Sequence, residues 1–221
     1  MSDAPTALLT SPVEAGDARD VAQPRKNSRV LLTVAPAAAG AIALAIALGV
    51  GLGWYAAPLT LVAAATGYIA VKDMWTLTIR DRDTLPIVAG VIGLTAAAAL
   101  LHGDAWPVAG AAISAAFIFA FLFVQAWLFG GVGGGDIKYS PAPAFALGAL
   151  SPLLALLWLL LALIASLGVG AVRHRRTGSN AIPLGPGMAV AIPLAIGLYP
   201  VLEALGFTWA AMGIAAPWIW A

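Results

Sequence analysis

Two aspartates stand where apolar runs give way to polar residues, and both are candidates for catalysis. Asp73 follows the apolar run VAAATGYIAV, with only Lys72 between, and Asp136 ends the glycine-rich stretch GGVGGGD. A carboxylate beside the hydrocarbon of a bilayer is costly, so such a residue is a functional candidate. Two carboxylates in one partly desolvated site cannot easily both ionise, and a pair that holds one proton can activate a water for attack on a peptide carbonyl. If they meet, the two residues predict aspartic-protease chemistry.

The glycines before Asp136 allow more than one interpretation. Five glycines lie within the six positions 130–135. Residues without a Cβ can adopt positive φ and let another backbone approach closely, so an extended substrate strand could lie beside Asp136. The same stretch could be only a flexible hinge between two helices. It could also be a re-entrant loop of a small transporter or channel, with Asp136 as a cation site.

The other polar residues favour ordinary structural roles. Aspartates alternate with arginines in one segment, which predicts a solvated, locally paired loop: Arg80, Asp81, Arg82 and Asp83. His102 and His174 have no companions at metal-ligand spacing, and the chain has no cysteine. The glycine run lacks the Gly-Lys-Ser/Thr ending of a phosphate loop. We therefore predict no metal, no cofactor and no nucleic-acid partner.

The elements that must position the two aspartates are membrane-spanning helices. The chain has 221 residues, of which 62% are hydrophobic and 10% charged. This balance is typical of a polytopic membrane protein, and apolar stretches long enough to cross a hydrocarbon core of about 30 Å follow one another along the chain. We predict an all-α bundle of about seven transmembrane helices: Val30–Trp54, Pro58–Val71, Leu85–Leu101, Trp106–Phe129, a short span at Tyr139–Leu150, Pro152–Val172 and Pro183–Leu205.

The distribution of lysine and arginine predicts the orientation of these spans. Basic residues favour cytoplasmic loops, and with a cytoplasmic N-terminus all eleven lysines and arginines fall on the inner side. Fusing residues 137–172 into one helix would move the basic cluster at 173–176 outward. We therefore predict a break before Pro152, which is well suited to begin a helix. This topology places Asp73 and Asp136 at similar depth on the cytoplasmic face.

Three regions follow from this pattern. Residues 1–29 mix charged residues with proline, serine and alanine without sustained apolar periodicity, which predicts a disordered cytoplasmic tail. Residues 30–205 form the membrane domain, whose first helix is expected to be a retained signal anchor. Residues 206–221 hold three tryptophans and are expected to form a segment at the lipid interface.

Three motifs resemble those of the type IV prepilin peptidases, membrane aspartic proteases that process the leader peptides of pilins and flagellins. GVGGGDIK, at 131–138, resembles the family's GxGD motif. DMWTLTIRDRDTLP, at 73–86, has the aspartate, loop and proline-containing helix start of the first motif, and IPLGPG, at 182–187, resembles the family's IPFGP element. The motifs occur in the family's order on the predicted cytoplasmic face, and the resemblance spans residues 58–205.

The resemblance implies that Asp73 and Asp136 are the catalytic pair. It implies supporting roles for a further set of residues: Gly131, Gly133, Gly135, Lys138, Pro183, Gly185 and Pro186. It also implies a multi-pass hydrolase of the inner (plasma) membrane that cleaves the basic leader of pilin, pseudopilin or flagellin-type substrates, in type IV pilus assembly and protein secretion. Larger relatives carry a cysteine-containing zinc domain and methylate the product. This cysteine-free chain is therefore expected to be a short form that cleaves without methylating.

The sequence also departs from the family pattern in two places. Arg80 stands where many relatives have proline, and Pro141 and Pro143 follow the GxGD motif, where they should delay or kink the fifth span. The presenilin and signal peptide peptidase group also uses a GxGD aspartate, but its YD and PAL motifs are absent here. The sequence leaves the oligomeric state open.

Overall fold

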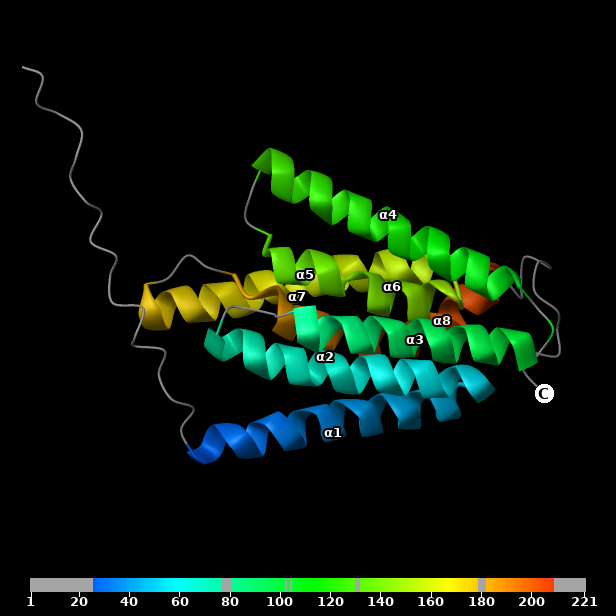
Figure 1. Cartoon of the computed structure of the whole chain (residues 1–221), viewed down its shortest axis with the longest axis horizontal. Coiled ribbons are helices and arrows are strands. Elements are labelled where there is room, and N and C mark those ends of the chain that lie inside the picture. Colours follow the sequence, from blue (N-terminus) through cyan, green and yellow to red (C-terminus); the bar gives the residue numbers. More distant parts are fainter. Residues whose placement is uncertain are drawn as a thin grey trace, which may run out of the picture.

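The chain folds as an all-α helix bundle (Figure 1). The computed structural model describes residues 26–76, 81–101, 103, 105–129, 132–178 and 182–208, and within these ranges it contains helices and no strand. In chain order the elements are α1 (Lys26–Gly49), the 3-10 helix η1 (Gly53–Tyr55), α2 (Ala56–Thr76), α3 (Asp81–Leu101), α4 (Trp106–Phe129), α5 (Gly134–Tyr139), α6 (Pro141–Gly148), α7 (Pro152–Thr177) and α8 (Leu184–Ala204). The predicted fold class is confirmed. Most of the predicted tail (1–29) and of the C-terminal segment (206–221) lies outside the described residues, so the division into regions stays a prediction.

Six of these helices are long and apolar enough to cross a bilayer: α1, α2, α3, α4, α7 and α8. Their apolar spans hold 20 to 24 residues, which at about 1.5 Å per residue matches a hydrocarbon core of about 30 Å. Large apolar side chains cover their outer surfaces, as Phe117, Phe121 and Phe123 of α4 show. These features indicate a multi-pass membrane protein.

The predicted short fifth span consists of two short helices in succession. Figure 1 shows α5 and α6 following one another along the bundle, from the end where α4 finishes to the end where α7 begins. Ser140 joins them, and Pro141 lies in the first turn of α6, where its missing N–H is not needed. The expectation that Pro141 and Pro143 delay or kink this span holds only in part. The helix breaks at Ser140, directly before Pro141, but it already begins at Gly134, and Pro143 lies within α6. The predicted break before Pro152 is confirmed, with Ser151 as the N-cap of α7.

Several helices have other bounds than their predicted spans: α1 begins at Lys26 and ends at Gly49 rather than running from Val30 to Trp54, and α7 continues past Val172 to Thr177. α2 continues past Val71 to Thr76, and α3 begins at Asp81 rather than Leu85. Hydropathy reports which residues contact lipid, whereas a helix continues wherever its backbone hydrogen bonds continue. Acidic side chains in the first turn of α3 also interact favourably with the positive end of its dipole. As a result, Asp73 lies within α2, and the hydrogen-bonded backbone of this helix fixes its position.

The short helix α6 occupies the centre of the bundle. All seven residues from Ala142 to Gly148 are buried, and the helix contacts α2, α3, α4 and α7. Its small residues allow close approach: a Cβ on Gly148 would lie 2.5 Å from the Cβ of Ser114 on α4, so a larger residue there would push the two helices apart. The buried indole of Trp158 donates to the Met188 carbonyl at 3.3 Å and joins α7 to α8.

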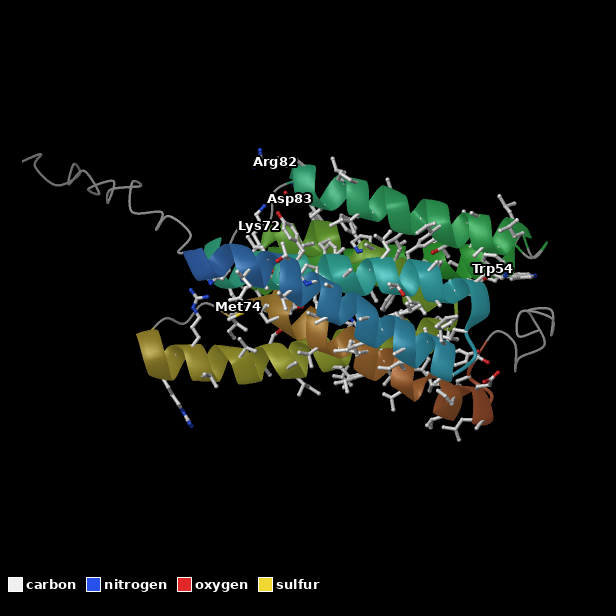
Figure 2. The ribbon with its side chains drawn as sticks, turned by 90° about the horizontal axis from the view of Figure 1, so that it is seen from below. Trp54, Lys72, Met74, Arg82 and Asp83 are labelled. Carbon is white, nitrogen blue, oxygen red and sulfur yellow. The ribbon has the colours of Figure 1, made fainter. Side chains whose placement is uncertain are left out.

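The two ends of the bundle differ in their side chains. Figure 2 shows Lys72, Met74, Arg82 and Asp83 at one end, and the exposed Trp54 at the opposite end. We refer to the first of these as the Lys72 end. There α2 finishes and α3, α5 and α8 begin (Figure 1). Segments that are far apart in the sequence therefore meet at this end.

Candidate active site

Asp73 and Asp136 are both buried at the Lys72 end of the bundle. Asp73 lies in the last turn of α2 and is 5% exposed, and Asp136 lies in the first turn of α5 and is 8% exposed. Carboxyl groups are seldom buried to this extent unless they are paired or functional. The two groups interact, because the charge of Asp73 helps to raise the pKa of Asp136. The fold thus brings together the two residues that the sequence singled out.

Burial is the main cause that raises the pKa of Asp136, to about 7. Repulsion from the Asp73 carboxylate raises this pKa further, and a backbone hydrogen bond from Gly133 opposes the increase. The buried Oδ1 atom of Asp136 has no hydrogen-bond partner among the described residues. Near neutral pH the carboxyl group therefore exists in both protonation states, which suits a general acid.

The third sequence motif contacts Asp73 directly. The backbone N–H of Gly185, in the first turn of α8, donates to Oδ2 of Asp73 at 3.2 Å. A Cβ on Gly185 would lie 3.1 Å from both Cβ and Oδ2 of Asp73 and 3.3 Å from the Cα of Ala70. Pro183, at the N-cap of α8, and Pro186 are buried beside it. Gly185 thus orients the Asp73 carboxylate from a position where a larger residue would be too close.

The described glycines of the GxGD motif do not adopt positive φ. Gly133 has φ −67° at the N-cap of α5, and Gly134 and Gly135 form the first turn of that helix. The expectation of positive φ is wrong for these three residues, and Gly131 lies outside the described residues. Close approach accounts for Gly133, because a Cβ there would lie 3.0 Å from Oδ2 of Asp136. No described atom lies within 4 Å of a Cβ built on Gly134.

Lys138 forms an ion pair with Asp81. Its Nζ donates to Oδ1 and Oδ2 of Asp81 at 2.8 and 3.0 Å. A second ion pair joins Lys72 to Asp83. The sequence predicted Asp81 and Asp83 in a locally paired loop. The structure instead places both in the first turn of α3, with lysine partners from α5 and α2.

A buried hydrogen bond between Tyr139 and Thr66 fixes α5 against α2. The two hydroxyl oxygens lie 2.5 Å apart, and Thr66 also donates to the carbonyl of Val62 at 2.5 Å. Both side chains are fully buried. Because Tyr139 lies about one turn after Asp136, this contact sets the depth and rotation of Asp136 relative to α2. Sequence reasoning missed it, and its only signal is a pair of hydroxyl groups within apolar spans.

The site offers two carboxyl groups of different surroundings and a backbone donor to each. With one shared proton, such a pair can take a proton from water and give another to a carbonyl oxygen. Among the described residues, no three histidine, aspartate or glutamate side chains gather closely enough to hold a metal ion. Proton transfer is chemistry that the two carboxyl groups can supply.

Comparison with known proteins adds one finding. The sequence matches a protein-family model, described as the Type IV leader peptidase family, over residues 60–172. The matched segment is just over half of the chain and contains both Asp73 and Asp136, whereas α8, with Gly185, lies beyond it. A search of the curated proteins found no match, and a search of the solved structures found none either.

Proposed function

This chain belongs to the type IV leader peptidase family, and we propose that it is an aspartic endopeptidase whose catalytic pair is Asp73 and Asp136. The proposed substrates are prepilin-like membrane proteins of the pilin, pseudopilin or flagellin type, from which it removes the basic leader. Family membership supports the peptidase activity. The observation that carries the aspartic mechanism is the burial, at one end of the bundle, of two interacting carboxyl groups from α2 and α5.

In the proposed mechanism the pair begins with one proton, on Asp136. Asp73 accepts a proton from a water as the water oxygen attacks the scissile carbonyl carbon, and Asp136 gives its proton to the carbonyl oxygen. The C–N bond of the tetrahedral intermediate then breaks. The leaving amine takes the proton from Asp73, and Asp136 regains a proton from a hydroxyl group of the intermediate. These transfers return the pair to its starting state, with one proton on Asp136 and none on Asp73.

We propose that cleavage takes place on the cytoplasmic side of the plasma membrane. In the predicted topology all eleven lysines and arginines lie on the side that carries the pair, as expected for cytoplasmic loops. The substrate would keep its apolar helix in the bilayer while an extended segment before that helix reaches the pair. No atom of the described residues lies within 4 Å of a Cβ built on Gly134, which supports such an approach next to Asp136.

Cleavage of a defined substrate tests this function. The chain is co-expressed with a prepilin-like protein from the same genome, and the N-terminus of the membrane-bound product is sequenced. We expect one cut between the basic leader and the apolar helix, found only when the chain is present. An intact leader in the presence of the chain, or the same cut in its absence, would contradict the proposal.

The cleavage rate should fall as the pH rises through about 7. Above the pKa of Asp136, about 7, the pair loses its shared proton and with it the general acid. The rate should then decline about tenfold for each pH unit, as expected for loss of one essential proton. Initial rates of the detergent-purified enzyme, measured from about pH 6 to about pH 9, check this. Circular dichroism at each pH controls for unfolding, and a rate that is flat or rises above pH 7 would exclude Asp136 as the acid.

A further inference from the structure

We infer that Asp81 and Asp83, the α3 aspartates, are positioning residues. They fix α2, which carries Asp73, and α5, which carries Asp136, in a defined position relative to each other. The inference rests on the proposed function, because it assigns these residues a role in placing Asp73 and Asp136. Neither side chain belongs to the catalytic pair. Each acts through a lysine that lies close in sequence to one member of it.

The two ion pairs have matching arrangements. Lys72 directly precedes Asp73 on α2, and it pairs with Asp83. Lys138 follows Asp136 by two positions on α5, and it pairs with Asp81. Figure 2 shows Lys72 and Asp83 lying together at the Lys72 end of the bundle. One turn of α3 is thus bonded to both segments that carry a catalytic aspartate.

The helix α5 needs such support. It has only six residues, follows the glycine run and is separated from α6 at Ser140. A helix of this length is not stable by itself. The buried Tyr139 hydroxyl holds one face of α5 against Thr66 of α2, while the Lys138 ion pair holds another part of it to α3. With both contacts in place, α5 has a defined rotation, and so does the Asp136 carboxyl group.

The two ion pairs differ in solvent exposure. This difference predicts which of the two contributes more to the position of the aspartates. The side chains of Lys72 and Asp83 are 18% and 14% exposed, whereas those of Lys138 and Asp81 are 57% and 59% exposed. An exposed pair competes with water and contributes little. A sheltered pair is screened less, and removing one partner leaves a partly buried charge without its partner in that pair. Loss of Asp83 should therefore be more damaging than loss of Asp81.

Kinetics of matched variants test the inference. Asp83→Asn should lower kcat for the prepilin-like substrate by about 10- to 100-fold, the scale expected for misplacing a catalytic group, and change KM by less than about twofold. Asp81→Asn should lower kcat by only about two- to fivefold. Asp83→Glu should restore most of the activity, and so should the exchanged pair Asp81→Lys with Lys138→Glu.

The matched control is Arg82→Gln. Arg82 lies between the two aspartates and points away from the bundle (Figure 2), so its substitution should leave kcat unchanged. Failure of Asp83→Glu to restore activity, or an equal loss in the Arg82 variant, would overturn the inference.

A distance measurement separates this inference from the proposed function. The chain has no cysteine, so Met74→Cys and Gly134→Cys introduce two unique sites for spin labels next to Asp73 and Asp136. We expect a narrow distance distribution that broadens on Asp83→Asn and stays narrow on Arg82→Gln. If the native chain fails to cleave the substrate, the proposed function is wrong, yet this broadening would still support the positioning role. An unchanged distribution in Asp83→Asn would overturn the role even in an active enzyme.

Discussion

Asp136→Asn should abolish leader cleavage, and Asp73→Asn should do the same. Asparagine keeps the shape of the side chain but cannot transfer a proton, so each variant lacks either the acid or the base. We expect kcat to fall by at least about 10³-fold in each, within the range attributed to general acid–base catalysis. The double variant should be no slower than either single variant, because the two groups act as a unit. N-terminal sequencing of the substrate with a quantified time course measures all three.

Stability of the Asp136 variant distinguishes lost chemistry from lost folding. The pKa of Asp136 is about 7 in the folded chain against an ordinary value of 3.8. Between these pH values the folded state binds a proton that the unfolded state releases, so this group makes folding less favourable as the pH rises through that range. Asparagine has no charge to bury. Asp136→Asn should therefore be more stable than the native chain at about pH 8, by up to about 4 kcal/mol.

Thermal unfolding in detergent at about pH 6 and about pH 8 checks this difference. The gain should be larger at the higher pH, where the native carboxyl is ionised. If either single variant retained activity, the assignment of Asp73 and Asp136 as the catalytic pair would be wrong. A variant that is inactive and also less stable than the native chain at the higher pH would contradict the burial of an ionised Asp136.

The helix order could be predicted because it depends on local properties of the chain. The span Trp106–Phe129 coincides with α4, and α7 begins at Pro152 as expected. Apolar length and proline act directly on the neighbouring backbone, so a single sequence suffices to recognise them. The polar ends of α2 and α3 were not predicted, because a helix that leaves the lipid no longer has an apolar pattern to mark its extent.

The contacts that orient the two aspartates could not be predicted in the same way. The hydrogen bond from Gly185 to Asp73 joins residues 112 positions apart, and the Lys138 to Asp81 ion pair joins residues 57 apart. Which side chains meet depends on the rotation and depth of each helix. In a membrane bundle both the lipid-facing and the protein-facing residues are apolar, so hydrophobic periodicity gives little information on rotation. The motifs therefore identified members of the site without their partners.

Gly185→Val should cause the largest loss of activity among changes outside the proposed catalytic pair. The backbone N–H that donates to Asp73 is kept in this variant, so the loss of activity is caused by steric crowding alone. A Cβ on Gly185 would lie 3.1 Å from the Asp73 carboxylate, and the two further methyl groups of valine would require a larger shift. We expect kcat to fall about tenfold for Gly185→Ala and about 10²-fold for Gly185→Val, as for a catalytic group displaced by up to about 1 Å.

Gly197→Val is the matched control for this prediction. Gly197 lies on the same helix, and no described atom lies within 4 Å of a Cβ built there. Its substitution measures the effect of a valine in α8 that does not contact Asp73. It should leave both kcat and thermal stability nearly unchanged.

Because α8 lies outside the segment that matches the leader peptidase family, comparing the two variants tests whether this helix belongs to the active site. Equal activity of Gly185→Val and Gly197→Val would show that α8 does not set the position of Asp73. A selective loss at Gly185 would mean that the catalytic pair depends on three segments, α2, α5 and α8.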